Sequence, residues 1–290
     1  MKKLLKLTAI ILALVFAAAM LAGCGQQAPA EEGTPSEEAA PSEEAAPSED
    51  AAPSSDAAST VDSVKAKGKL TMLTNAAFAP FEYLDTEGNV AGVDVEVAQA
   101  IADELGVELE VVDMDFDGIP AAVQSGKGDL GIAGMSINEE RKKTVDFSDP
   151  YVNTTICIVV KEENTEITSS DDLSGKTVGV QLGTTSDLFS SDLEGVEVAR
   201  YKTSPDAIAE LLNGKIDAVI VDEMPANDAV KANEGLKILD EPLTTEQYAI
   251  AMPKGTDLAE VVNKVISQLM ADGKIDELVE KHMALAAEAA

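Results

Sequence analysis

Apolar and polar positions alternate along the chain in a way that is typical of helices packed on a mainly parallel sheet. Short apolar runs at 70–74 and 109–112 predict buried strands, and the stretch 93–105 between them predicts an amphipathic helix. Asp94 can cap the start of this helix, and Gly106 can take the left-handed conformation at its end. The pattern therefore predicts an α/β fold.

Two stretches far apart in the sequence, 122–133 and 211–221, follow one plan. Each contains the end of a helix, a Gly-Lys turn, an aspartate and an apolar run that predicts a buried strand. The aspartates, Asp129 and Asp217, lie 88 positions apart, which is too far for a solenoid repeat. The repeated plan predicts two similar α/β units rather than one continuous sheet.

The first 23 residues have the pattern of an export signal. Lysines near the start precede an apolar run at 7–20, which is too short to span a membrane comfortably. The tetrapeptide Leu-Ala-Gly-Cys that ends at Cys24 resembles the lipobox of bacterial lipoproteins. This resemblance implies that residues 1–23 are removed and that Cys24 is lipidated at the outer face of the cell membrane, while cleavage of an ordinary signal nearby is the alternative.

The next segment, 24–60, has the composition of a disordered tether. The hexapeptide Pro-Ser-Glu-Glu-Ala-Ala begins at Pro35 and recurs with drift at Pro41, Pro47 and Pro53. So few apolar groups cannot offset the conformational entropy that folding removes. We expect this acidic segment to hold a folded domain above the membrane surface.

The charge of the chain limits its partners. The sequence has 53 acidic and 21 basic side chains and a formal net charge of −32. This charge argues against binding to nucleic acid or directly to anionic lipid. We interpret the acidity as a contribution to solubility, with steering of cations toward a pocket as the alternative.

Cysteine and histidine are too scarce for several kinds of site. Besides Cys24 the sequence contains Cys157 in the apolar run 155–160, where we expect a buried side chain without a disulfide. The single histidine, His282, is predicted to lie at the surface. The sequence therefore gives no support for a nucleophile activated by histidine or for a metal site built from histidines. We predict no catalytic residue, metal or cofactor.

Several motifs in a fixed order give the sequence a family resemblance. They lie at 75–83, 92–96, 114–118, 139–143, 146–151, 178–185, 217–222 and 252–255. From about residue 61 to the last helix the chain resembles the polar amino-acid-binding proteins of ABC importers, solute-binding protein family 3. The resemblance implies an extracytoplasmic monomer, not an enzyme, that delivers a polar amino acid to permease and ATPase subunits. The sequence has no P-loop, so ATP hydrolysis would belong to those partners.

The resemblance also implies a two-lobed periplasmic-binding-protein-like fold of type II. Lobe 1 would comprise 61–150 and 249–290, and lobe 2 would comprise 156–243. Two hinge strands would join the lobes near 151–155 and 244–248. A ligand that contacts both lobes can shift their equilibrium toward the closed form.

By the same resemblance, the charged groups of the ligand meet residues of suitable chemistry. Arg141 would hold the α-carboxylate through two parallel hydrogen bonds, assisted by Thr184 and Thr185 at the start of a helix. Asp222, at the end of a predicted buried strand, matches the ammonium-binding aspartate of the family. A solvated arginine and ordinary helix or turn caps are the alternatives.

Other matching positions would form the wall of the site. Ala133, Gly134 and Ser136 follow a predicted buried strand, where the family uses a backbone carbonyl and a hydroxyl, and where ordinary turn chemistry is the alternative. Phe78 and Phe116 match positions whose rings sandwich the ligand, with burial in the core as the alternative.

Ligand selectivity is predicted from two variable positions, Asn75 and Gln181. Relatives that select cationic amino acids often have an aspartate where Asn75 stands, so the sequence favours neutral polar ligands. Asp115, Asp117 or Glu82 could still supply a negative wall, which leaves a cationic ligand open.

Two other functions on the same fold are left open by the sequence. A prephenate or arogenate dehydratase needs a general acid or base, which the abundant carboxylates could supply. The pairing of Arg141 with Asp222 suits a zwitterion better. The chain could also be a sensory or adhesive surface lipoprotein that uses the same two-lobed fold together with a separate partner.

Overall fold

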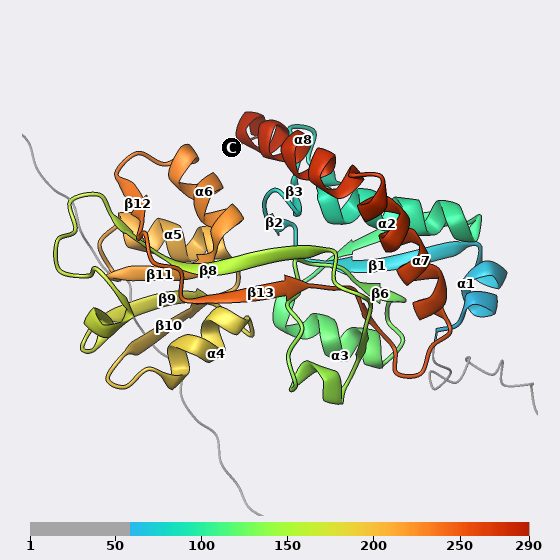
Figure 1. The fold of residues 1–290 in the computed structure, drawn as a ribbon, viewed down its shortest axis with the longest axis horizontal. Helices are drawn as coiled ribbons and strands as arrows, with labels where there is room; N and C mark the ends of the chain where they lie inside the picture. Colours follow the sequence, from blue (N-terminus) through green and yellow to red (C-terminus); the bar gives the residue numbers. More distant parts are fainter. Residues whose placement is uncertain (1–58, 290) are drawn as a thin grey trace, which may run out of the picture. The chain divides into compact units, whose positions relative to one another are not determined.

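The computed structural model describes residues 59–289. The predicted signal, Cys24 and nearly all of the predicted tether lie outside these residues. Within 59–289, no helix combines the length and apolar character needed to cross a lipid bilayer. The described chain forms two main sheets flanked by helices, which confirms the predicted α/β class (Figure 1).

The first sheet has five strands in the order β5-β1-β6-β14-β7. β1 is parallel to β5 and β6, whereas β14 is antiparallel to β6 and β7. Every strand falls within the segments predicted for lobe 1, and we use that name for this half. The strands are β1 (Lys69–Thr74), β5 (Glu108–Asp113), β6 (Leu130–Gly131), β7 (Asp146–Phe147) and β14 (Ala251–Met252).

Lobe 1 also contains a small antiparallel sheet and several helices. The small sheet consists of β2 (Ala77–Phe78), β3 (Glu82–Leu84) and β4 (Val90–Ala91). The helices are α1 (Val61–Lys67), α2 (Val93–Leu105), α3 (Ile119–Gln124), α7 (Leu258–Ala271) and α8 (Lys274–Ala289), with 3-10 turns η1 (Phe116–Gly118) and η2 (Arg141–Lys143).

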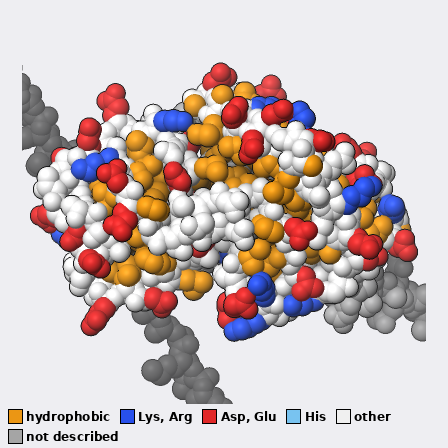
Figure 2. Space-filling view, in the orientation of Figure 1, with side chains coloured by type: hydrophobic (Ala, Val, Ile, Leu, Met, Phe, Trp, Pro, Cys, Tyr) orange, Lys and Arg blue, Asp and Glu red, His pale blue; other side chains and the backbone are white. Residues whose placement is uncertain are grey.

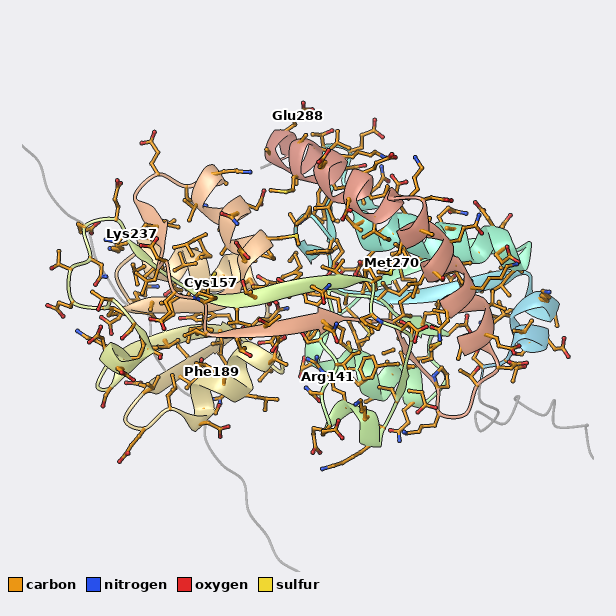
Figure 3. All side chains as sticks on the ribbon, in the orientation of Figure 1. Arg141, Cys157, Phe189, Lys237, Met270 and Glu288 are labelled. Atoms are coloured by element: carbon orange, nitrogen blue, oxygen red, sulfur yellow. The ribbon has the colours of Figure 1, made fainter. Side chains whose placement is uncertain are left out.

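The other half of the described chain, which we call lobe 2, is built on the second sheet. Five of its six strands follow the order β10-β9-β11-β8-β12, and the sixth, β13, pairs with β8. The strands are β8 (Val152–Lys161), β9 (Thr177–Gln181), β10 (Glu197–Tyr201), β11 (Ala218–Asp222), β12 (Leu236–Ile238) and β13 (Thr244–Tyr248). The helices are α4 (Thr185–Asp192), α5 (Ser204–Leu212) and α6 (Glu223–Ala232), with the 3-10 turn η3 (Ser170–Leu173). Cys157 lies in β8 and is buried, as the sequence predicted (Figure 3).

Two antiparallel strands connect the lobes. β13 pairs with the first half of β8, from Thr244 opposite Ile156 to Tyr248 opposite Val152. Both strands extend from one lobe toward the other in Figure 1. The paired residues are 152–156 and 244–248, whereas the predicted hinge segments are 151–155 and 244–248.

The repeated aspartates have the same structural role in each lobe. The Asp129 carboxylate accepts a hydrogen bond from the Thr71 amide at 2.7 Å, and the Asp129 amide donates to the Thr71 carbonyl at 2.8 Å. Asp217 makes the corresponding pair with Thr177, at 2.8 and 2.9 Å. Each aspartate thus extends the pairing of two parallel strands, so the repeat is a feature of folding rather than of ligand binding.

Helix α2 has the predicted bounds, but its start is not capped as predicted. Gly106 ends the helix in the left-handed conformation, at φ 73°. Gly92 occupies the N-cap, and the Asp94 side chain makes no cap hydrogen bond. The Asp94 carboxylate instead accepts from the Tyr151 hydroxyl and from the Gly134 amide. These long-range partners compete successfully with the local cap.

The prediction that His282 lies at the surface is wrong. His282 is only 3% exposed, and its Nδ1 lies 3.0 Å from the Tyr83 hydroxyl. Its Nε2 lies 3.2 Å from Glu96 of α2. Burial is the main cause that lowers the pKa of His282. The amphipathic pattern of the last helix could not show which face would pack on lobe 1.

Acidic side chains are spread over the described domain. Figure 2 shows Asp and Glu side chains at many separate places on the visible face, with basic side chains (Lys and Arg) among them. Such a distribution fits the interpretation that the acidity contributes to solubility.

We expect Gly92→Ala to destabilise the domain by about 3 kcal/mol, because the backbone leaves no room for a side chain. Gly92 has φ 140°, and a Cβ there would lie 1.9 Å from the Phe81 carbonyl oxygen. Urea unfolding measures the loss. Gly126→Ala is the matched control, since Gly126 has φ 72° but no atom within 4 Å of its added Cβ. Equal losses in the two variants would contradict the steric explanation.

Candidate ligand-binding site

One cleft between the lobes collects all the predicted ligand-binding residues. The cleft is narrow, with room for about one water molecule between its walls. Lobe 1 lines it from β2, β3, η1, η2 and the loops that follow β1 and β6, and lobe 2 lines it from β9, α4 and β11. The lining residues are Asn75, Phe78, Glu82, Phe116, Ala133, Gly134, Ser136, Arg141, Gln181, Thr184, Thr185 and Asp222. Of these, only Glu82 is absent from the predicted set.

Arg141 is a buried cation at the boundary of the lobes. It lies in η2, is 8% exposed, and is labelled near the boundary of the lobes in Figure 3. Its Nη1 donates to the Ser136 carbonyl at 2.5 Å, and its Nη2 donates to the Gly183 carbonyl of lobe 2 at 3.0 Å. Burial lowers the pKa of Arg141 to about 10, so the guanidinium remains charged at neutral pH. It is therefore a fixed positive charge rather than a solvated member of the Arg-Lys-Lys run.

The start of α4 supplies hydroxyl groups opposite Arg141. Thr184 is the N-cap, and its Oγ1 accepts from the Asp187 amide at 3.2 Å. Thr185 Oγ1 donates to Glu246 of β13 at 2.7 Å. Ser136 Oγ, from lobe 1, donates to the same Glu246 oxygen. Glu246 thus joins hydroxyls of both lobes beside the cleft, in a role that the sequence analysis missed.

Asp222 is a buried carboxylate that ends β11. It is 6% exposed, and its Oδ1 has no hydrogen-bond partner among residues 59–289. It begins α6 without a side-chain cap hydrogen bond, so the capping alternative does not describe it. Burial raises the pKa of Asp222 to about 7, against the opposing effects of Tyr248 and Arg141. A carboxylate with an unused, buried oxygen is suited to an ammonium group.

The aromatic wall is partly core and partly cleft. Phe78 packs at 6.2 Å from Phe81 and 6.4 Å from Tyr248, measured between ring centroids. Gly134 lies against the Phe78 ring at φ 50°, and a Cβ at this glycine would come within 2.7 Å of the ring. The guanidinium carbon of Arg141 lies 5.2 Å from the centroid of Phe116. Both phenylalanines also line the cleft, next to Ala133 and the loop after β6.

Asn75 and Gln181 satisfy one another across the cleft. Gln181 Nε2 donates to Asn75 Oδ1 at 2.8 Å, and Asn75 Nδ2 donates to the Met114 carbonyl at 2.9 Å. At the rim, Lys202 of lobe 2 forms an ion pair with Asp115 of lobe 1 at 2.8 Å. The hydrogen bond between Asn75 and Gln181 thus joins the two lobes, and both side chains also line the cleft.

Among the three acidic residues considered for a negative wall, only Glu82 lines the cleft. Asp115 is paired with Lys202 at the rim, and Asp117 is not among the lining residues. Glu82 is 0% exposed, and among residues 59–289 its carboxyl group has no hydrogen-bond neighbour except the acidic side chain of Asp94. Its place in β3 opposite Phe78 of β2 directs it beside the aromatic wall. Sequence alone could suggest its charge but not its burial.

The chain matches known families and structures over the described domain. The model of the bacterial extracellular solute-binding proteins, family 3, matches residues 70–284. The L-cystine-binding protein TcyJ of Escherichia coli is 36% identical over 225 residues, which cover 76% of this chain and 85% of that protein.

Two solved structures extend the comparison. A mutant of ArgBP from T. maritima is 44% identical with a TM-score of 0.75, covering 77% of this chain and 99% of that one. An ancestral arginine-binding protein bound to glutamine is 46% identical with a TM-score of 0.71, covering 74% and 97%. These relatives are named as binding proteins. The predicted two-lobed fold and the family resemblance are confirmed, and the similar proteins named above include an L-cystine-binding and an arginine-binding protein. The chain belongs to the bacterial extracellular solute-binding proteins of family 3.

Proposed function

We propose that this protein captures a cationic amino acid between its lobes, with L-arginine as the first candidate, and delivers it to an ABC importer without catalysing a reaction. The observation that carries the cationic assignment is Glu82, a fully buried carboxyl group that lines the cleft and whose only hydrogen-bond neighbour among residues 59–289 is another acidic residue, Asp94.

The charge of the cleft supports this assignment. A neutral amino acid presents one carboxylate and one ammonium, which Arg141 and Asp222 can match. Glu82 is an additional acidic group, and only a ligand with a second positive charge allows it to be buried in its charged form. A ligand with a second positive charge gives Glu82 a partner, and burying a polar group is costly when it has none.

The aromatic residues support a planar cation. Phe78 and Phe116 line the same cleft as Glu82. A guanidinium stacks on aromatic rings and can bind a carboxylate through two parallel hydrogen bonds, which an ammonium cannot. Asn75 is engaged with Gln181, so its neutrality is a weaker guide to the ligand than Glu82. The similar ancestral protein is named as arginine-binding and has been solved with arginine and with glutamine bound, which is consistent with this choice.

We also propose that Cys24 carries the lipid anchor, that residues 24–60 tether a monomeric domain to the membrane, and that this domain delivers its ligand to permease and ATPase subunits. The lipobox-like sequence and the repeated acidic segment support this arrangement. Retention of the Cys24→Ser variant in the membrane fraction would contradict the anchor.

A thermal-shift scan tests the function. The domain from Ser59 onward is heated with each of the twenty amino acids, and with cystine, citrulline and prephenate, using a dye because the chain lacks tryptophan. A ligand at 100 times its Kd adds about 2.7 kcal/mol, or about 5–10 °C in Tm for a domain of this size. We expect L-arginine to give the largest shift. A shift with prephenate alone would favour the dehydratase, and no shift with any compound would favour the surface-partner alternative.

We expect Glu82→Gln to weaken L-arginine binding by roughly 10–100-fold, because it removes a charged hydrogen-bond acceptor from the cleft. Binding of L-glutamine should change less. Isothermal titration calorimetry measures both. The matched control is Glu87→Gln in the exposed turn between β3 and β4. A parallel loss for both ligands would argue against a contact between Glu82 and the ligand side chain.

A further inference from the structure

A second buried carboxyl group, Asp94, lies beside Glu82. Asp94 belongs to α2, is 0% exposed and does not line the cleft. Its Oδ1 accepts from the Tyr151 hydroxyl at 2.6 Å, and its Oδ2 accepts from the Gly134 amide at 2.8 Å. Both oxygens of Asp94 therefore have neutral donors, and its carboxylate is also within hydrogen-bond reach of the Glu82 carboxyl group, which has no other partner within 59–289.

The groups around Glu82 are acidic or neutral. They are Asp94 of α2, Asp113 at the end of β5, Tyr151 before β8 and Tyr248 of β13. Burial raises the pKa of Glu82 well above its usual value, and the negative charge of Asp94 raises it further. Burial also raises the pKa of Asp94, but its two hydrogen-bond donors oppose that rise. The hydrogen bonds thus favour the charge on Asp94 and the proton on Glu82.

We propose that the Glu82–Asp94 pair holds one proton when the cleft is empty or contains a neutral ligand, and releases it when a cationic side chain enters. The proton passes from the Glu82 carboxyl group to solvent, and the positive charge of the ligand takes its place. Asp94 acts as a positioning residue, since it keeps Glu82 protonated without touching the ligand. This inference rests on the proposed binding of a cationic amino acid.

The exchange makes selectivity depend on pH. Binding that expels one proton strengthens by up to about tenfold for each pH unit, as long as the empty site is protonated. L-arginine affinity therefore rises with pH in this range and levels off above it. A neutral ligand with a side-chain carbonyl keeps the proton, because protonated Glu82 can donate a hydrogen bond to it. Low pH thus favours neutral polar ligands over cationic ones.

Asp222 must be separated from this effect. Its raised pKa means that it also loses a proton when the ligand's ammonium arrives. This loss is common to every α-amino acid, whereas the Glu82 proton is lost only to a cation. The difference between L-arginine and L-citrulline, its neutral near-isostere, isolates the Glu82–Asp94 pair.

Isothermal titration calorimetry in two buffers of different ionisation enthalpy counts the released protons. The protein is the chain from residue 24 onward with Cys24→Ser, titrated near neutral pH with L-arginine and with L-citrulline. We expect L-arginine to release about one proton more than L-citrulline, and Glu82→Gln to abolish the difference. Equal proton release by the two ligands would overturn the proton exchange while leaving arginine binding intact. Failure of both arginine and lysine to bind would overturn the proposed function instead.

Infrared difference spectroscopy of the wild-type chain keeps the test independent of whether the variant folds. We expect the C=O band of a protonated carboxyl group to lose more intensity with L-arginine than with L-citrulline. Equal loss with the two ligands would contradict the exchange.

Discussion

Arg141→Ala should reduce amino-acid affinity by at least roughly 100-fold, because it removes the fixed positive charge that meets the α-carboxylate. Loss of one partner from a buried ion pair costs about 3–5 kcal/mol. Arg141 is buried and its guanidinium is held by the carbonyl groups of Ser136 and Gly183, so the protein itself fixes its orientation. Calorimetric titration with the ligand found in the thermal scan measures the change.

The control for Arg141 is its neighbour in η2, Lys142. Its side chain is 48% exposed and pairs with Glu139 of the preceding turn. We expect Lys142→Ala to bind like the wild type, because surface pairs of this kind contribute little. Unfolding midpoints of both variants check that the domain is intact. Wild-type affinity in a folded Arg141→Ala variant would remove this residue from the site.

Asp222→Asn should weaken binding of every α-amino acid by roughly 100-fold or more. The substitution keeps the shape of the side chain but leaves the buried ammonium of the ligand without a countercharge, at a cost of about 2–5 kcal/mol. Unlike Glu82→Gln, it should affect arginine and glutamine alike. The control is Glu223→Gln, one residue further on, at the exposed start of α6.

The same residue predicts a pH dependence shared by all ligands. With a pKa of about 7 in the empty cleft, Asp222 is increasingly protonated as the pH falls below neutrality. The ammonium must then displace a proton, so affinity should fall with decreasing pH and level off above the pKa. Titrations of L-glutamine across this range should show the fall in the wild type and lose it in Asp222→Asn. An unchanged slope in the variant would assign the dependence to another group.

The sequence predicted the local elements well where local signals and tertiary packing agree. Helix α2 has both its expected bounds because its apolar face packs in the core and Gly106 ends it. Asp94 does not cap the helix because its carboxylate accepts hydrogen bonds from two residues far along the chain, Tyr151 and Gly134. His282 was misplaced for the same kind of reason, since its partners Tyr83 and Glu96 become neighbours only in the fold.

The predicted site residues come together because most of them lie at strand ends and helix starts that face one cleft. Glu246 was not selected, and Glu82 was only one of three acidic residues named for a negative wall, since a carboxylate in a short strand looks the same in sequence whether it faces solvent or a cavity. Complete burial distinguishes Glu82, and contacts with Thr185 and Ser136 distinguish Glu246. The preference for a neutral ligand rested on Asn75, whose partner Gln181 belongs to that other lobe.

A crystal structure of the complex with L-arginine is the most direct test of the proposed binding mode. Crystals grown with L-arginine should show it between the lobes, with its carboxylate at Arg141, its ammonium at Asp222 and its guanidinium at Glu82. A ligand bound elsewhere, or bound in the cleft with its side chain directed away from Glu82, would contradict the proposed recognition.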